Sequence, residues 1–244
     1  MKWNGKVTFG KDWLGYVGLN DESSPHVHVA IQLCVGLQYG VRVALDDGIL
    51  EGDGVIIGPG VRHHALVSTG RMALLFLYPD APLGRALHRQ LGSRGTAVAS
   101  QAITHCIRHA ATLEQAVVAL QQCLVSAQAF DPRLSNILDL LRADCSGVGA
   151  VSRAASTAGI SRPRLRHVAH SQMGVPLSQW IIWRKLERSC RALALEASLS
   201  DAAMQGGFAD QAHLTRMMRR MIGLSPGRVA LILRKTSDSF NNPR

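Results

Sequence analysis

Residues 207–228 read G-F-A-D-Q-A-H-L-T-R-M-M-R-R-M-I-G-L-S-P-G-R, and this stretch decides how the C-terminal part of the chain folds. Its apolar residues recur at i, i+3, i+4 and i+7, the spacing of a helix that packs one side on a core. The other side is rich in basic and amide side chains, which suit the base edges and phosphates of DNA. The apolar side consists of Leu214, Met217, Met218 and Met221, and the basic side of Gln211, His213, Arg216, Arg219 and Arg220.

Both ends of this predicted helix carry boundary signals. Asp210 can accept hydrogen bonds from the first free backbone N–H groups, and Gly223 can adopt the left-handed conformation that ends a helix. Ser225 and Pro226 have the features of the cap and first residue of another helix. Because most charged helix faces are simply solvated, this pattern alone is compatible with a solvated surface as well as with a nucleic-acid interface.

Two segments of the stretch, G-F-A-D-Q-A-H-L-T-R and G-L-S-P, resemble the second helix-turn-helix unit of AraC/XylS-family transcription regulators. The resemblance covers residues 131–233 and implies a sequence-specific DNA-binding regulator, in this family usually an activator that contacts RNA polymerase. Three positions depart from the family pattern: His167 replaces Arg, Ala169 replaces Phe, and Met218 replaces an aromatic residue. The matching positions are Gly159, Ser161, Leu165, Gly174, Trp183, Arg184, Gly207, Phe208, Asp210, Gln211, His213, Leu214, Arg216, Gly223, Ser225 and Pro226.

A second unit of the same kind is predicted upstream, after a domain boundary at Asp131. Residues 151–158 predict a short helix, 159–160 a tight turn, and 161–173 a helix that could enter a major groove. A long helix over 176–195, about 20 residues and roughly 30 Å by its rise per residue, would separate the two units. The two units could therefore address neighbouring major-groove segments on one face of DNA.

We expect outward-facing side chains of the second helix in each unit to contact DNA. Arg and His can donate to guanine, Gln can bridge adenine, and Ala212 is small enough to admit a thymine methyl group. Arg216 could instead form a surface ion pair. Arg184, Arg219 and Arg220 are expected to contact phosphates or solvent rather than base edges. The predicted DNA-binding residues are Arg162, Arg164, Arg166, His167, Gln211, Ala212, His213, Arg216 and Arg220.

The charge distribution favours a polyanionic partner for the C-terminal part. Of the formal net charge of +10, residues 1–150 contribute none, with twelve Lys+Arg and twelve Asp+Glu, whereas residues 151–244 carry fifteen and five. Such asymmetry suits double-stranded DNA or an acidic membrane surface. We recognise no signal peptide, and the strongest apolar run, at 73–78, is too short to span a membrane. We therefore expect a bacterial cytoplasmic protein, associated with the nucleoid when bound to DNA.

The cysteines are odd in number, widely spaced and without a C-x-x-C pair. This pattern is typical of separate buried thiols in a reducing compartment rather than of a disulfide framework or a zinc ribbon. The five residues are Cys34, Cys106, Cys123, Cys145 and Cys190.

The N-terminal half is expected to be β-rich. Its short apolar runs, bounded by Gly, Pro, Asp or Asn, predict the strands of a small barrel or sandwich. The segments H-V-H-V-A-I-Q at 26–32 and G-D-G-V-I-I-G-P-G-V-R-H-H at 52–64 are similar to the two cupin motifs, which implies a cupin-like sensor domain. The expected fold class is therefore α+β, with a small N-terminal cupin-like β-barrel, a helical connector and an all-α domain containing two helix-turn-helix units.

A histidine cluster marks a candidate effector site in this half. His26 and His28 are two residues apart, so on a strand both point to one face, and Gln32 joins them there. His63, with His64 as the alternate, follows in the second motif. Cupin enzymes have a carboxylate at the position of Gln32, yet three imidazoles could still bind zinc, nickel or copper. Three uses stay open: a polar lining for an organic effector, a core cluster satisfied by hydrogen bonds, and a divalent metal site at His26, His28 and His63.

A helical seam lies between the two halves. Apolar residues recur there at intervals of four, three and four, which predicts a helix packed on its own domain or on a second subunit. Helices at this place commonly form the dimer contact in AraC-type proteins, so a homodimer is expected. The seam is Leu113, Val117, Leu120 and Leu124, and the predicted domains are a sensor at 1–95, a connector at 96–130 and a DNA-binding domain at 131–244.

Other functions compete with transcription regulation. The G-x-S-x-G match at 223–227 lies within the predicted helix-turn-helix stretch, and the sequence has no phosphate-binding loop or pair of motif-embedded carboxylates, so we predict no enzyme activity. One alternative is a metal-dependent cupin enzyme or metal sensor that carries a DNA-binding domain. Another is a basic domain that binds DNA or membranes without specificity. The only cofactor considered is a divalent metal, zinc or nickel. The expected effector is either a small organic molecule or such a metal ion.

Overall fold

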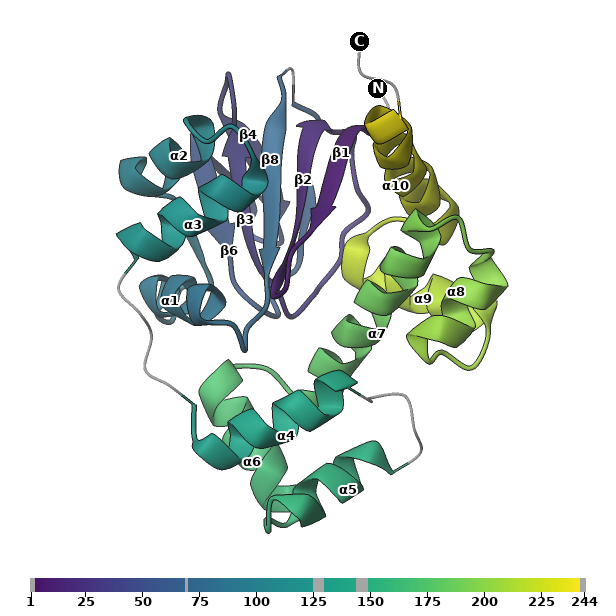
Figure 1. Cartoon of the computed structure of the whole chain (residues 1–244). Coiled ribbons are helices and arrows are strands. Elements are labelled where there is room, and N and C mark those ends of the chain that lie inside the picture. The colour runs from purple at the N-terminus through teal and green to yellow at the C-terminus, as the bar shows by residue number, and fades with distance from the viewer. Residues whose placement is uncertain (1–2, 69, 125–129, 144–148, 242–244) are drawn as a thin grey trace.

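The computed structural model describes residues 3–68, 70–124, 130–143 and 149–241, and these form an α+β protein as predicted. A β-rich half comes first, and the part after it is helical (Figure 1). Residues 125–129, at the end of the predicted connector, and Cys145 lie outside the described residues. None of the described helices combines the length and the apolar character needed to cross a membrane.

The strands of the β-rich half form two antiparallel sheets. The larger has the order β1-β2-β8-β3-β6-β9 and the smaller has the order β5-β4-β7. The expected barrel is thus a pair of sheets that do not close on each other within the described residues. The strands are β1 Asn4–Phe9, β2 Trp13–Leu19, β3 Ile31–Gly36, β4 Val41–Leu45, β5 Gly48–Gly52, β6 Gly54–Ile57, β7 His63–Ala65, β8 Met72–Leu77 and β9 Thr96–Val98.

Strand β3 is buried along its whole length because both faces of the larger sheet are covered. Ile31, Leu33 and Val35 belong to one core, shared with the first three helices. Since side chains alternate along a strand, Gln32 and Cys34 point to the opposite face, which packs toward the smaller sheet and the C-terminal helices. This second face carries the candidate sensor site.

Helices α1 to α3 cover the first face of the larger sheet (Figure 1). The four seam residues are buried there, so the seam packs on its own domain. The four described cysteines are free thiols as predicted, but Cys123 is exposed rather than buried, and its Sγ lies 3.3 Å from that of Cys106. The helices are α1 Pro82–Leu91, α2 Gln101–Arg108 and α3 Leu113–Cys123.

The helical half follows the predicted boundaries closely. The side chains of Ser161 and Asp210 cap two helices by accepting hydrogen bonds from the backbone N–H groups of Arg164 and His213. Gly223 ends the second of these helices with a φ of 73°. The helices are α4 Pro132–Ala143, α5 Ala150–Thr157, α6 Arg162–Met173, α7 Leu177–Ala194, α8 Leu199–Gly206, α9 Gln211–Ile222 and α10 Pro226–Asn241.

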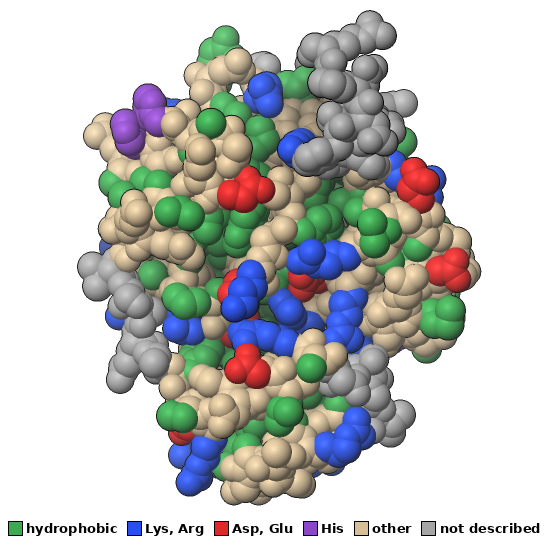
Figure 2. Space-filling view, in the orientation of Figure 1, with side chains coloured by type: hydrophobic (Ala, Val, Ile, Leu, Met, Phe, Trp, Pro, Cys, Tyr) green, Lys and Arg blue, Asp and Glu red, His purple; other side chains and the backbone are tan. Residues whose placement is uncertain are grey.

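The two halves of the chain are packed together. Helix α10 lies beside β1 (Figure 1), and the Arg191 guanidinium donates to the carbonyl oxygen of Gly10 at 2.8 Å. Arg142 of α4 pairs with Asp80, whose side chain is fully buried. Figure 2 shows Lys and Arg side chains gathered where the β-rich half meets the helices below it. Polar and ionic contacts thus tie the helices to the sheet domain.

Candidate DNA interface and effector pocket

Helix α9 presents the exposed basic face that its sequence predicts. Leu214, Met218 and Met221 are buried, and Met217 is partly buried. His213 is half-buried rather than fully exposed, because its ring packs edge-on against Phe208, with 5.2 Å between the ring centroids. The other predicted DNA-binding residues of this helix are solvent-exposed: Gln211, Ala212, Arg216 and Arg220.

Helix α6 repeats this construction in the first unit. Its buried side consists of Leu165, Val168 and Ala169, together with Met173 at its C-terminal end. Ala169, which replaces the usual Phe, is completely buried, so the departure from the family pattern lies in the core and not on the outer face. The four predicted DNA-binding residues are all exposed: Arg162, Arg164, Arg166 and His167.

Arg184 does not lie where it was expected. Its side chain is 13% exposed, pairs with Glu187 at 2.9 Å, and lies over the Tyr78 ring, 5.0 Å from the centroid. Glu187 also pairs with Arg191 at 2.9 Å. The prediction that Arg184 meets phosphates or solvent is therefore wrong, because this guanidinium belongs to an ion-pair network at the junction of the two halves.

The N-terminal half touches the C-terminal end of α9. The backbone N–H of Ser24 donates to the carbonyl oxygen of Gly223 at 3.1 Å, and the N–H of Val27 donates to that of Arg220 at 3.1 Å. A Cβ atom added at Gly223 would lie 2.4 Å from the Ser24 oxygen. The segment that carries the first two histidines is thus docked directly on the C-terminal end of α9.

Two further contacts join the halves near the recognition helices. Gly174, which ends α6, lies against His88 of α1, so that an added Cβ would come within 2.4 Å of the imidazole. Arg228 of α10 pairs with Asp21 at 3.1 Å. Helices α6 and α9 therefore both end against the half that carries the candidate sensor site.

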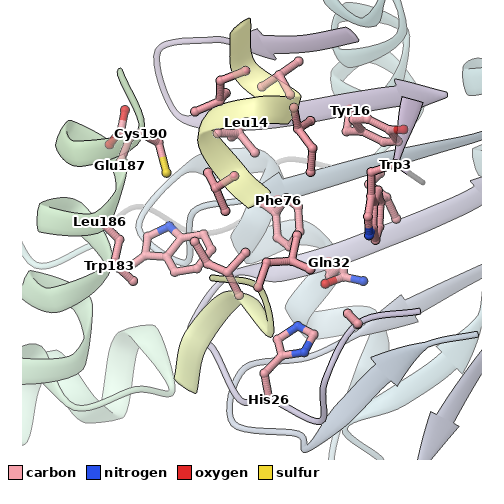
Figure 3. Close-up of a pocket in the computed structure, with 18 of the residues that line it drawn as sticks. Trp3, Leu14, Tyr16, His26, Gln32, Phe76, Trp183, Leu186, Glu187 and Cys190 are labelled. Carbon is pink, nitrogen blue, oxygen red and sulfur yellow. The ribbon is translucent and has the colours of Figure 1, made fainter. Parts of the chain in front are cut away.

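A pocket of about 120 Å³ lies at the same junction (Figure 3). Its walls come from strands β1, β2 and β8, from α7, and from the chain around the end of α9 and in α10. Trp3 and Trp183 stand on opposite sides of it, and neither indole Nε1 has a hydrogen-bond partner in the described chain. Neither tryptophan was predicted as a site residue, because no local spacing links positions so distant in sequence.

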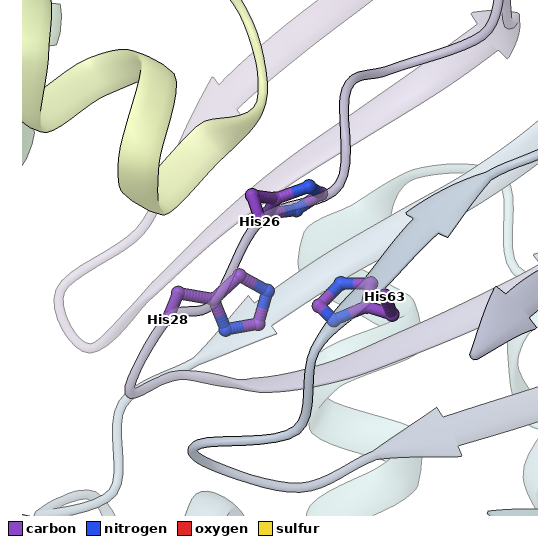
Figure 4. Close-up of side chains that lie close together, drawn as sticks. All are labelled: His26, His28 and His63. Atoms are coloured by element: carbon purple, nitrogen blue, oxygen red, sulfur yellow. The ribbon is translucent and has the colours of Figure 1, made fainter. Parts of the chain in front are cut away.

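The three histidines converge at the edge of this pocket (Figure 4). His26 and His28 precede β3 rather than lying on it, and an isolated bridge pairs His26 with His63. One ring nitrogen from each histidine lies within 4.8 Å of the others. His63 is the inward-facing member of the adjacent pair, and His64 is half-exposed.

Hydrogen bonds orient all three imidazoles. Each Nδ1 lies 2.8 to 3.0 Å from a backbone carbonyl oxygen. This contact fixes the ring and favours the tautomer in which Nε2 carries no proton and can bind a metal ion. The Nε2 atoms of His28 and His63 lie 2.8 and 3.1 Å from the Gln32 side-chain oxygen. If Nδ1 carries the proton in both rings, each Nε2 is an acceptor that faces the Gln32 oxygen, which is also an acceptor. A bound cation, or a Gln32 amide rotated so that its NH₂ group points at the rings, would remove this repulsion.

Burial keeps these histidines neutral. It lowers the pKa of His28 to about 4 and the pKa of His63 to about 2, with the neighbouring imidazoles adding to the effect, and it also lowers the pKa of His26. Neutral imidazoles are the form that binds metal ions.

The same shifts predict acid destabilisation. Below about pH 6.5 the unfolded chain takes up protons that the folded chain does not bind until the pH is far lower, so stability falls as the pH drops. We expect urea unfolding to give a free energy that is smaller at pH 5 than at pH 7.5 by about 2 kcal/mol for each of His28 and His63. His63→Gln should reduce this difference, and the same difference in that variant would contradict the assignment.

Comparison with known proteins connects these features. A family model described as a helix-turn-helix domain matches residues 154–230, from α5 into α10. A probable transcriptional regulator, LumQ of Photobacterium leiognathi, is 23% identical over 236 residues, which cover 88% of this chain and 95% of LumQ. The matched region thus contains both recognition helices, and the similarity to LumQ extends over both halves.

Crystal structures of ToxT from Vibrio cholerae have the same overall fold. An apo point variant of ToxT superposes with a TM-score of 0.63 at 10% identity, covering 92% of this chain and 98% of ToxT. Wild-type ToxT bound to an unsaturated fatty acid superposes with a TM-score of 0.57 at 11% identity, covering 93% and 98%. This chain and ToxT therefore share the same order of a β-rich half and a helical half over nearly their whole lengths.

Proposed function

We propose that this chain, a DNA-binding transcription regulator with a helix-turn-helix domain of the AraC type, reads two neighbouring major-groove segments with α6 and α9. The observation that carries the proposal is the repeated construction of these helices, each capped, buried on one side and lined with Arg, His or Gln on the other. Helix α7, with 18 residues, sets the two units about 27 Å apart by its rise per residue. The proposed contacts are the exposed residues Arg162, Arg164, Arg166, His167, Gln211, Ala212, Arg216 and Arg220, with half-buried His213.

Selection from a random duplex pool by the full-length chain at physiological salt tests this proposal. We expect enrichment of two short blocks about one helical turn, or roughly 10 base pairs, apart. Sequencing of the retained DNA gives the result, and a second selection with residues 131–244 serves as the comparison. Retention without any enriched motif in both selections, collapsing as salt rises, would mean purely electrostatic binding and would contradict the proposal.

The junction pocket is the proposed effector site. Its walls come from both halves, and it reaches the residues that follow α9, so a ligand there would contact the sensor and the reader together. A ligand that binds one arrangement of the halves more tightly shifts the population toward it. The fatty acid bound in ToxT supports the idea that a protein of this fold accommodates an apolar effector.

A metal-sensing role is the second candidate. It is favoured by the three buried imidazoles, each held by its Nδ1 and pointing its other nitrogen toward a common centre. Zinc and nickel both accept imidazole ligands, and the Gln32 oxygen could complete the set. Because His26 lies beside Gly223, an ion bound here would act on the segment docked on α9.

Metal uptake by protein purified without a tag tests this second candidate. We expect the wild-type chain and His64→Ala to take up one zinc or nickel ion per chain and His63→Ala to take up none, as measured by elemental analysis after dialysis. His64 is the matched control because it is adjacent to His63 but half-exposed. No uptake by the wild-type chain would show that the Gln32 amide closes the cluster by hydrogen bonds and would remove the metal-sensing role.

The remaining assignments belong to the same proposal. We divide the chain into a cupin-like sensor at 1–95, a connector at 96–130 and a DNA-binding domain at 131–244. Activation through RNA polymerase and homodimer formation stay predictions. Because the seam of α3 is covered by the sheet, a dimer would have to use another surface, such as the outer side of α3, where Val118 is exposed.

A further inference from the structure

Buried hydrogen-bond donors on opposite sides of a mainly apolar pocket lack acceptors among the described residues. The Nε1 atoms of Trp3 and Trp183 are inaccessible to solvent and lack a partner among the described residues. The two side chains are 8% and 6% exposed, and Figure 3 shows them on opposite sides of the pocket. Because buried indole N–H groups normally have a partner, these donors indicate a ligand that supplies acceptor atoms.

The charges of the pocket indicate that this ligand is not an anion. Glu187 is the one charged side chain among the described lining residues, and its carboxylate is already paired with Arg184 and Arg191. His26, which also lines the pocket, is buried, and its Nδ1 already lies 2.8 Å from the backbone carbonyl oxygen of Ser24. An anionic ligand would be buried near a carboxylate without a free cation, which is strongly unfavourable.

We propose that the pocket binds a neutral, mainly apolar molecule whose carbonyl-type oxygens accept hydrogen bonds from Trp3 and Trp183. The inference rests on the proposed effector site and adds the chemical class of the effector. Trp3 directly precedes β1, whereas Trp183 lies on α7, so one molecule with two acceptors would join the two halves of the chain. This chain would therefore differ from ToxT, whose bound ligand is a fatty acid.

Calorimetric titration of the full-length chain with matched ligand pairs tests the proposal. The probes are dimethyl esters of straight-chain dicarboxylic acids of about four to six carbons, kept short because the pocket has a volume of about 120 Å³, together with the corresponding dicarboxylates. The esters carry two neutral carbonyl acceptors on an apolar chain, and the acids carry charges on the same chain. We expect at least one ester to bind, and to bind at least about tenfold more tightly than its dicarboxylate.

Three tryptophan variants identify the donors. Trp3→Phe and Trp183→Phe should each weaken ester binding about five- to tenfold, because each removes one neutral hydrogen bond and little apolar surface. Trp180→Phe is the matched control, since its Nε1 is also buried and unpaired within the described chain but the residue does not line the pocket. Circular dichroism establishes whether each variant is folded. If one pocket variant does not fold, the other is compared with Trp180→Phe.

The proposal is wrong if no ester binds, if a dicarboxylate binds as tightly as its ester, or if a folded Trp3→Phe or Trp183→Phe variant keeps full ester affinity. The duplex selection separates this failure from failure of the proposed function. An enriched DNA motif without ester binding overturns only the ligand class. Ester binding that depends on the two tryptophans, without any enriched motif, supports the ligand class and contradicts sequence-specific DNA recognition.

Discussion

Replacing Arg216 by alanine will lower the affinity for the selected operator by about 1–3 kcal/mol, or roughly 5- to 150-fold, and will change the affinity for random DNA far less. Arg216 lies on the exposed face of α9 and forms no ion pair within the described part of the chain. A guanidinium free to donate two parallel hydrogen bonds can distinguish guanine from other bases. Titration of labelled operator and scrambled duplexes at one salt concentration measures both affinities.

Arg220→Ala is the matched control on the same helix. Its side chain is exposed, but its backbone carbonyl accepts the N–H of Val27, which places it at the end of α9 that is docked on the sensor half. We expect this variant to weaken operator and scrambled DNA alike and to reduce the salt dependence by about one ion. Equal losses on both duplexes for Arg216→Ala and Arg220→Ala would contradict the division into a base-reading and a phosphate-contacting residue.

The helical half could be predicted from the sequence because its signals are local. The caps Ser161 and Asp210, the terminal glycine of α9 and the apolar spacing of α6 and α9 all act within a few residues of where they stand. It was also predictable that only one of His63 and His64 faces inward, since adjacent residues of a strand point to opposite faces, and in the structure that residue is His63. Local rules therefore identify both the recognition helices and the exposed side chains that they present.

The junction between the halves could not be predicted in this way. Trp3 and Trp183 come to line one pocket, and Ser24 comes to donate a hydrogen bond to Gly223, only after the whole chain has folded. Arg184 is a second example. The family resemblance suggested a role for this residue, but it did not show that the buried Glu187 pairs with it. The cysteines of α2 and α3 are a further case, brought into contact by helix packing. Contacts of this kind depend on tertiary structure, for which a single sequence offers no spacing rule.

The contact between Ser24 and Gly223 leads to the second large prediction. Gly223→Ala should lower the free energy of unfolding by about 2–4 kcal/mol, of which about 1–2 kcal/mol is the cost of a left-handed alanine and the rest is overpacking. Gly223 has a φ of 73°, and the added Cβ would lie 2.4 Å from the Ser24 oxygen and 2.6 Å from His26 Nδ1. Urea unfolding measures the loss.

Gly159→Ala separates these two causes. Gly159 has a similar φ of 65°, but an added Cβ there would meet no heavy atom of the described chain within 4 Å, so this variant should lose only the conformational part. Hydrogen exchange adds a local measurement: the amides of Ser24 and Val27, which donate to the end of α9, should exchange faster in Gly223→Ala and not in Gly159→Ala. Equal losses of stability and unchanged exchange in both variants would mean that the histidine-bearing segment does not press on α9. In the proposed function the pocket and the histidine cluster would act on DNA binding through this segment, so that result would also remove the proposed link between the sensor half and α9.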